Sequence, residues 1–516
     1  MRRTAWYRPW VTVLIAIALA GVTIALRVPF ISHTLFAWDS ANFALALNHY
    51  NVAFHQPHPP GYPLYVAIAK LVSFWVIDAN ASFVYISIAA SGLAVAALFL
   101  LASRMYDPWT GFVSAILLAV SVGFWGYGEV AYPYTSLALF EILMAWLCYL
   151  MWQGNRTVAI LSGLVLGIAG GIRQDILVFM GLLWLVSVWR TGLIRFILSS
   201  VVLCLTVAAW LYPAVQLSGG WAVFEQASAA QGALVLPSSS VLFQGVGGVR
   251  HNSLLLVHSL DQMFGATALV TLYGIGRFLT FRGVVTDQRL RFLLFWFVPP
   301  LLIYTLIHIG EPGYVLSIVP VLCIVTAVII RDILRDVRST LLLALSRRRG
   351  LKNSSSLALA GGATVAVLVV AGLVAWNVNA FIRTEGPARW QEIRSIDSIL
   401  TGQVQYARGL QPNSVVILAN DRFRQMQYYL PDYNVRLLYD EFVNDYQLVR
   451  YEYQIPEGVT TVLLMDDGPD GAPPVVGAGV EATLVPFPNA HLWQFKVEPG
   501  DVIQYGYNYF GIKGRS

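Results

Sequence analysis

The chain has 516 residues, of which 57% are hydrophobic and only 12% are charged, and its mean hydropathy is +0.63. This composition excludes a soluble globular protein and indicates a membrane protein. Residues 1–383 carry 23 Lys and Arg against 12 Asp and Glu, or +11, whereas residues 384–516 carry 10 against 16, or −6. The positive charges lie in short loops between apolar runs, so they indicate membrane topology rather than nucleic-acid binding.

Apolar runs long enough to cross a bilayer core recur along the first 383 residues. A twelfth run, 62–78, is predicted to lie at the membrane interface, because this places 18 Lys and Arg on the cytoplasmic side and four outside, as the positive-inside rule requires. The N-terminus is then cytoplasmic and the C-terminus external, in a plasma (inner) membrane. Eleven transmembrane helices are predicted, near residues 11–31, 81–103, 111–127, 133–152, 157–172, 175–189, 193–216, 264–281, 290–309, 313–331 and 356–380.

The first apolar run is interpreted as a retained anchor, with a cleaved signal peptide as the alternative. Two external loops, 32–80 and 217–263, are long, and long loops in compact membrane proteins usually bind or catalyse. The first contains Asp39 and then His55–Tyr65, whose four prolines should prevent a helix until about Pro63. The second loop either orders over a bound lipid or is a passive connector.

The chain is divided into a transmembrane module, 1–383, and an external domain, 384–516, whose composition is that of a soluble α/β protein. Buried-strand patterns alternate there with a helix-compatible segment, and a small open sheet with a few helices is predicted. The predicted elements are strand Ser414–Ala419, helix Asp421–Leu430, strand Val435–Tyr439 and strand Thr460–Met465.

One apolar span, an acidic residue just beyond it, and the segment His58-Pro59-Pro60-Gly61-Tyr62-Pro63-Leu64 opening an amphipathic helix resemble the GT-C superfamily of integral-membrane glycosyltransferases. The segment is more similar to protein O-mannosyltransferase-like members than to aminoarabinose-lipid transferases, whose corresponding segment is usually Pro-Pro-Leu. The likeness extends to the span count, to Gly310–Tyr314 opening a late span, and to an external C-terminal domain. The family often carries two adjacent acids in the first loop, whereas Ser40 follows Asp39 here.

The resemblance implies a polytopic α-helical GT-C-like fold with about eleven transmembrane helices and a small external α/β domain. It also implies inverting transfer of a sugar from a polyprenyl-phosphate donor to an acceptor hydroxyl on a protein, lipid or glycan. Asp39 is the predicted general base; the alternative is that it only caps a short interfacial helix. Glu129, in a short external turn, could support Asp39 or orient the acceptor, or only cap the next span.

Arg173 is predicted to bind the departing phosphate in bidentate fashion. The alternatives are that it pairs with Asp175 or extends to lipid headgroups. Glu141, deeper in a span, is predicted to be paired, protonated or cavity-lining. The other predicted donor-binding residues are His58, Tyr62, Gln174, His308, Glu311 and Tyr314.

We expect Asp39, His58 and Arg173 to gather around one lipid-accessible hollow. No Asp-x-Asp motif is present, so no metal site and no obligatory cofactor is predicted, and the lipid-linked sugar is a substrate. The predicted partners are the bilayer, this donor and an acceptor that the sequence does not specify. The main alternative is a membrane transporter or lipid flippase, which often has repeated halves that are not evident here. A receptor or assembly subunit would leave the His58 segment unexplained.

Overall fold

The computed structural model describes residues 9–272, 287–346, 354–440, 443, 445–465, 475–487 and 490–513. The chain forms two compact units. The first, Met1–Ile31 with Pro59–Gln391, is built from helices and is called the helical unit. The second, Ser32–His58 with Glu392–Ser516, contains the β-sheets and is called the mixed unit.

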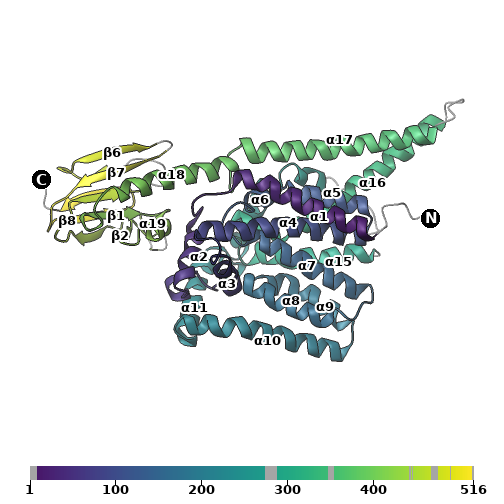
Figure 1. The fold of residues 1–516 in the computed structure, drawn as a ribbon, viewed down its shortest axis with the longest axis horizontal. Helices are drawn as coiled ribbons and strands as arrows, with labels where there is room; N and C mark the ends of the chain where they lie inside the picture. The colour runs from purple at the N-terminus through teal and green to yellow at the C-terminus, as the bar shows by residue number, and fades with distance from the viewer. Residues whose placement is uncertain are drawn as a thin grey trace. The chain divides into compact units, whose positions relative to one another are not determined.

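The helical unit is a bundle of long apolar helices that run nearly parallel to one another (Figure 1). Six described helices are long and apolar enough to cross a membrane. Many of their large apolar side chains are exposed, Ile17 and Leu205 among them, as expected for surfaces that face lipid. The protein is a multi-pass membrane protein. The six are α1 with η2 (Pro9–Phe30), α4 (Ala79–Met105), α7 (Tyr134–Trp152), α10 (Leu193–Leu217), α15 (Gln288–Leu306) and Ala363–Arg383 of α17 (Ser354–Arg383).

Other predicted spans form shorter or interrupted helices. The predicted span 111–127 is divided at Val120–Ser121 into two helices, and the predicted span 313–331 begins with a 3-10 turn. Half of the predicted span 264–281 (residues 273–281), and most of the predicted cytoplasmic linker 346–356, lie outside the described residues. The helices concerned are α5 (Pro108–Ala119), α6 (Val122–Gly126), α8 (Ala159–Ile172), α9 (Ile176–Trp189), η4 (Pro312–Ser317) and α16 (Val319–Ser346).

The Pro-rich segment ends where α3 (Pro63–Val72) begins, so the predicted start of a helix at about Pro63 is confirmed. Proline at the first helical position loses no hydrogen bond, which explains the start. Ten residues give a helix about 15 Å long, roughly half of a bilayer core, so α3 is too short to cross it. Phe74, Trp75 and Ile77, just after α3, are exposed apolar side chains, which suit the predicted interfacial position.

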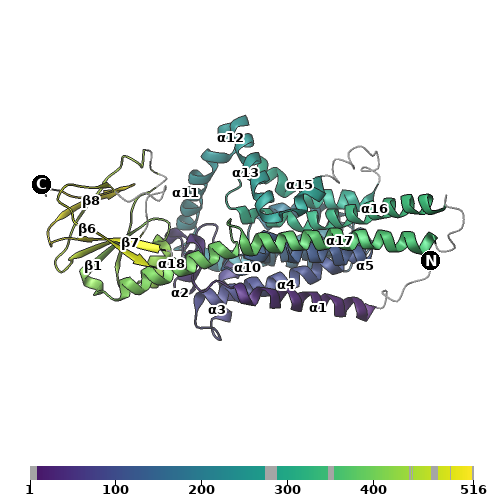
Figure 2. The ribbon, with the colours of Figure 1, turned by 90° about the horizontal axis from the view of Figure 1, so that it is seen from above.

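The predicted loop 217–263 is mainly helical. It forms α11 (Trp221–Ser239), α12 (Val241–Gln244) and α13 (Val246–Phe264), with α12 at the tip between the other two (Figure 2). The turn is closed by Asn252, whose amide donates to the carbonyl of Ser239 at 2.9 Å. These helices therefore form an ordered arm rather than an irregular connector.

The mixed unit contains two sheets. The first has the order β2-β1-β4-β7-β6, with β1 parallel to β2 and β4, and the second has the order β3-β8-β9-β5. The predicted strands at 414–419, 435–439 and 460–465 and the predicted helix at 421–430 are confirmed, but the prediction of one small sheet is incomplete. The strands are β1 (Val415–Ala419), β2 (Asn434–Leu437), β3 (Tyr451–Gln454), β4 (Thr461–Leu464), β5 (Val475–Val476), β6 (Ala482–Phe487), β7 (Ala490–Lys496), β8 (Val502–Gly506) and β9 (Tyr509–Lys513).

Two helices pack on the first sheet of the mixed unit. α18 (Trp390–Arg408) buries Leu400, Val404 and Ala407 against it, and α19 (Phe423–Tyr429) buries Met426. The first-loop segment Ser32–His58 contributes α2 (Trp38–Asn48) and η3 (Val52–Phe54), and α2 packs against α19. Residues that follow the first span thus share a compact unit with the C-terminal part of the chain.

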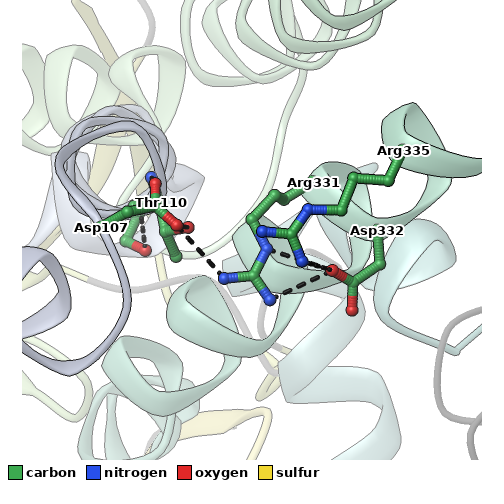
Figure 3. A network of polar contacts seen from close by, with 6 residues as sticks. Asp107, Thr110, Arg331, Asp332 and Arg335 are labelled. Carbon is green, nitrogen blue, oxygen red and sulfur yellow. Dashed lines mark hydrogen bonds and ion pairs between the residues drawn. The ribbon is translucent and has the colours of Figure 1, made fainter. Parts of the chain in front are cut away.

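Within the helical unit, a network of charges links α16 to the start of α5 (Figure 3). Asp107 caps α5 by accepting from the Thr110 amide at 2.9 Å, and Arg331 of α16 donates to the same carboxylate at 3.2 Å. Arg331 also contacts Asp332, which in turn lies 3.4 Å from Arg335. Arg331 thus joins α16 to the start of α5.

Candidate functional site

Asp39 lies in the first turn of α2. The residue just before this helix, Ala37, is its N-cap and has an extended conformation. A carboxylate is favoured at this position because the helix N-terminus carries partial positive charge. The Nδ1 atom of His58 lies 3.2 Å from Oδ1 of Asp39, and the two side chains are 15% and 31% exposed, respectively. Asp39 and His58 therefore form a close pair of side chains that remains partly exposed.

Between the end of α2 and His58 the chain folds into a short loop, residues 51–56, that backbone hydrogen bonds close. The Asn51 and Gln56 backbones exchange two hydrogen bonds, at 2.6 and 3.0 Å. His55, inside the loop, has φ of 54°, and Tyr62, just after it, has φ of 47°. Left-handed backbone costs a non-glycine residue about 1 kcal/mol or more, and such conformations cluster at functional sites. The loop returns the chain so that His58 meets a carboxylate nineteen positions earlier.

Arg424 of α19 adds a positive charge to this region of the mixed unit. Its Nη2 donates to the Phe54 carbonyl at 3.2 Å, and its guanidinium lies 5.9 Å from the centre of the Trp38 ring. Burial lowers the pKa of His55, and the charges of Arg424 and His58 lower it further against the opposing effect of Asp39. The His55 imidazole is therefore held neutral beside the Asp39–His58 pair.

Arg173 lies in the helical unit, directly after α8, and is 4% exposed. Its Nε donates to Asp175 Oδ2 at 2.7 Å, so the predicted alternative of a pair with Asp175 is present. The guanidinium carbon lies 4.8 Å from the centre of the Tyr134 ring and 4.6 Å from that of Tyr314. Within the part of the chain that the structure describes, Nη1 and Nη2 make no hydrogen bond, so they keep donors that an anion can use.

Several of the predicted donor-binding residues surround Arg173 in the helical unit. Tyr62 lies within electrostatic range of the guanidinium, and Gln174 donates to the Pro60 carbonyl at a long 3.5 Å. The His308 and Tyr314 rings are 6.2 Å apart, centre to centre. Glu311, exposed, is within electrostatic range of Tyr134. The guanidinium and the side chains that act on it electrostatically are called the Arg173 cluster: Arg173, Asp175, Tyr62, Tyr134 and Tyr314.

The sequence did not single out Tyr304 or the tight packing of Gly313, which build the Arg173 cluster together with the predicted residues. Tyr304 donates to the Tyr314 carbonyl at 2.7 Å and holds it in place. A Cβ at Gly313 would lie 2.5 Å from the Tyr134 ring, so glycine is required for the ring to approach. Glu141, which the sequence did single out, is fully buried on α7, where the charges of Asp175 and Arg173 act on it. The aromatic Gly310–Tyr314 segment was the available signal.

His308 has a partner within the helical unit. Its Nδ1 lies 3.0 Å from the Ser239 hydroxyl at the end of α11. Burial lowers the pKa of His308, and the charge of His251 lowers it further, so the ring is held neutral. His308 thus joins α11 to the segment after α15, and its predicted contact with the donor stays a prediction.

Glu129 is fully buried in the turn between α6 and α7, beside the indole of Trp125. The opposite charge that acts on it is Arg27, which is also fully buried and donates to the carbonyls of Ala119 at 3.1 Å and Phe124 at 3.4 Å. This setting suits a structural role for Glu129. Its predicted support of Asp39 stays a prediction.

Asp39 and His58 belong to the mixed unit, and Arg173, Tyr62, Gln174, His308, Glu311, Tyr314 and Glu129 belong to the helical unit. Convergence of Asp39, His58 and Arg173 on one hollow stays a prediction. Among the described residues, no group of three or more His, Cys, Asp or Glu is arranged to hold a metal ion.

No protein-family profile matches the chain, and no curated protein matches it in sequence. Solved structures do match. ArnT from Cupriavidus metallidurans bound to undecaprenyl phosphate has a TM-score of 0.57 at 11% identity, over 96% of this chain and 98% of that one. Its apo state has a TM-score of 0.55 at 11% identity, over 94% and 97%.

The archaeal oligosaccharyltransferase AglB from Archaeoglobus fulgidus, in complex with an inhibitory peptide and a dolichol-phosphate, has a TM-score of 0.46 at 12% identity, over 89% of this chain and 70% of that one. The likeness to ArnT extends over nearly the whole of both chains. It shows the GT-C fold suspected from the sequence, with a β-containing C-terminal domain.

Proposed function

We propose that this chain is a GT-C glycosyltransferase that uses a polyprenyl-phosphate sugar and inverts the anomeric centre as it glycosylates an acceptor hydroxyl. The reaction takes place on the external face of the plasma membrane, with the N-terminus in the cytoplasm. The observation that carries the proposal is the Asp39–His58 pair, in the loop that follows the first span of a chain with this fold. The undecaprenyl phosphate bound to ArnT supports a polyprenyl-phosphate carrier for the donor.

Asp39 acts as the general base. Its carboxylate accepts the proton of the acceptor hydroxyl while the hydroxyl oxygen forms a bond to the anomeric carbon. The bond between that carbon and the phosphate oxygen breaks, and its electron pair leaves with the polyprenyl phosphate on the opposite face. His58, whose Nδ1 lies 3.2 Å from the carboxylate, orients that carboxylate and disperses its negative charge. Attack and departure on opposite faces invert the anomeric centre.

Arg173 binds the phosphate of the donor. A guanidinium whose two terminal nitrogens make no hydrogen bond to the described residues can chelate a phosphate with parallel hydrogen bonds. The rings of Tyr134 and Tyr314 and the carboxylate of Asp175 hold its plane in one orientation. Donors held in this way act on the charge that develops on the leaving phosphate without reorganising.

The first experiment offers the purified protein in lipid nanodiscs a panel of polyprenyl-phosphate sugars, with polyprenyl-phosphate mannose as the arm for the mannosyltransferase-like subtype. A ligand that binds the folded state stabilises it by about 2.7 kcal/mol at a hundred times its Kd. A donor that raises Tm is then incubated with protein, lipid and glycan acceptors, and free polyprenyl phosphate is measured.

The same experiment separates the proposal from a transporter or flippase. A glycosyltransferase releases polyprenyl phosphate only when an acceptor is present. A flippase moves the intact donor across the bilayer without breaking the glycosidic bond. Intact donor in every arm, together with its movement between leaflets, would refute the proposed function.

We also propose that transfer needs no divalent ion, because Arg173 supplies the positive charge at the phosphate. EDTA should then leave the rate within about twofold of the untreated enzyme. A loss of activity with EDTA that Mg²⁺ or Mn²⁺ restores would contradict this part of the proposal.

A further inference from the structure

One carboxylate of α18 accepts four hydrogen bonds from the segment between α1 and α2. Asp397 accepts from the amides of His33 at 2.9 Å and Thr34 at 2.8 Å. It also accepts from the hydroxyls of Ser32 at 3.1 Å and Thr34 at 2.6 Å. Residues 32–37 are in no helix or strand, so no regular backbone hydrogen bonding holds them. These four hydrogen bonds to Asp397 hold the segment instead. The contact joins positions more than 360 residues apart, and all of it lies within the mixed unit.

The helix that carries Asp397 is itself held firmly. Leu400, Val404 and Ala407, on later turns of α18, are buried against β1 in the core of the mixed unit. A carboxylate on a helix packed in this way has a defined position. The segment 32–35 therefore takes its place from the C-terminal domain (Glu392–Ser516).

Two further contacts from the C-terminal domain hold the same loop. The hydroxyl of Tyr429 accepts from the Leu35 amide at 2.9 Å, and Arg424 donates to the Phe54 carbonyl at 3.2 Å. Leu35 lies four residues before Asp39, and Phe54 lies four residues before His58. The C-terminal domain thus contacts the loop four residues before Asp39 and again four residues before His58.

We propose that Asp397 is a positioning residue for the reaction, and that the C-terminal domain holds α2 so that Asp39 meets the acceptor hydroxyl. This inference rests on the proposed function. It assigns the C-terminal domain a part in the proton-transfer step through Asp397, in addition to any part in choosing the acceptor. Without the anchor, residues 32–37 lose their order and α2 shifts, and a misplacement of about 1 Å can reduce turnover by about a hundredfold.

The test uses the full chain in nanodiscs and the variants Asp397→Ala and Asp397→Asn. Alanine removes all four hydrogen bonds, whereas asparagine keeps the volume and one acceptor oxygen. Hydrogen exchange should quicken at His33, Thr34 and Leu35 by about tenfold or more in Asp397→Ala, because each bond to a charged group contributes enough for a change of that size. The effect of Asp397→Asn should be smaller.

Turnover should fall by about ten- to a hundredfold in Asp397→Ala, with the KM for the donor within about threefold of wild type. A merely structural role would predict loss of donor binding and of folded protein together. Asp501→Ala is the control, because Asp501 is another carboxylate of the same domain and accepts from the Glu498 amide at 2.8 Å, in a turn between β7 and β8. This control should change neither loop exchange nor turnover.

Hydrogen exchange at β1 shows whether a variant has unfolded the domain. If Asp397→Ala has unfolded it, Asp397→Asn, which preserves packing, tests the anchor and the positioning role instead. Unchanged exchange at residues 33–35 in both variants would overturn the anchor. Faster exchange with normal turnover would overturn the positioning role. If the wild-type protein transfers no sugar, the proposed function fails, and the exchange experiment still decides whether Asp397 anchors the loop.

Discussion

Arg173 and Arg331, both in the helical unit, have similar neighbours. Each pairs with an aspartate and lies near tyrosine: Arg173 contacts two tyrosine rings, and Arg331 lies 5.2 Å from the centre of the Tyr106 ring. They differ in how much of their hydrogen-bonding capacity the protein uses. All three nitrogens of Arg331 face the carboxylates of Asp107 and Asp332 (Figure 3).

Arg173 bonds through Nε alone among the described residues, although it is the more buried of the two. A buried cation with unused donors costs stability unless a ligand completes it. The comparison teaches that the pairing of an arginine with an aspartate does not by itself mark a structural site. The unused Nη1 and Nη2 donors of Arg173 support the proposed phosphate contact, whereas the nitrogens of Arg331 are used to join helices.

The largest predicted effect is on turnover. Arg173→Gln should reduce transfer by about two to three orders of magnitude, because it removes the donors aimed at the leaving phosphate. Arg331→Gln should leave transfer within about twofold. Initial rates at saturating acceptor measure both. Equal losses in the two variants would remove the distinction between the two arginines.

The next largest predicted effect is on stability, through the buried carboxylate of Glu129. Glu129→Gln should lower the free energy of unfolding by about 3 kcal/mol, because it leaves the buried Arg27 without its opposite charge. Thermal unfolding in one detergent measures the change. Glu311→Gln, at an exposed position, is the control and should alter stability by about 0.5 kcal/mol or less. A stable Glu129→Gln protein that is inactive would instead favour the predicted catalytic support.

The smallest effect is a pH dependence in the mixed unit. The folded-state pKa of His55 is lowered by burial and by Arg424. The unfolded chain therefore binds this proton more readily, and the stability contributed by His55 is complete above about pH 6.5. It is lost as the pH falls below 6.5 towards the folded-state pKa. The protection factors of residues 51–56, which are exchange rates corrected for the intrinsic rate at each pH, should fall from pH 7.5 to pH 5.5. His55→Gln should reduce that dependence. The same pH profile in both proteins would contradict this assignment.

The sequence predicted the long helices well because a bilayer requires about 20 apolar residues in helix, a pattern that is visible locally. It also predicted β1 and β4, which are continuous apolar runs in the middle of a sheet. It missed β6, which contains Pro486, and the hairpin of β8 and β9. The Tyr507-Asn508 turn, with φ of 53° at Asn508, lacks the Asn-Gly or Asp-Gly pair that usually marks a hairpin in a sequence.

The candidate site was predictable where its contacts are local. Arg173 and Asp175 are two residues apart, and the prolines before α3 indicated that the chain turns back at His58. No local pattern could indicate that Asp397 binds Thr34 or that Arg424 approaches Phe54, because these contacts depend on how the C-terminal sheet is assembled. A polar residue on an amphipathic helix usually faces solvent, and the sequence of α18 gives no reason to expect otherwise.

The role of Asp39 is tested most directly by comparing Asp39→Asn with Asp78→Asn. Asp78 caps α4 by accepting from the Ala81 amide at 2.7 Å, and asparagine caps a helix equally well. Asp39→Asn should reduce transfer by about a thousandfold, as expected for loss of a general base, while the donor still raises Tm as in the wild type. Asp78→Asn should transfer normally. Unchanged product formation by Asp39→Asn would contradict the account.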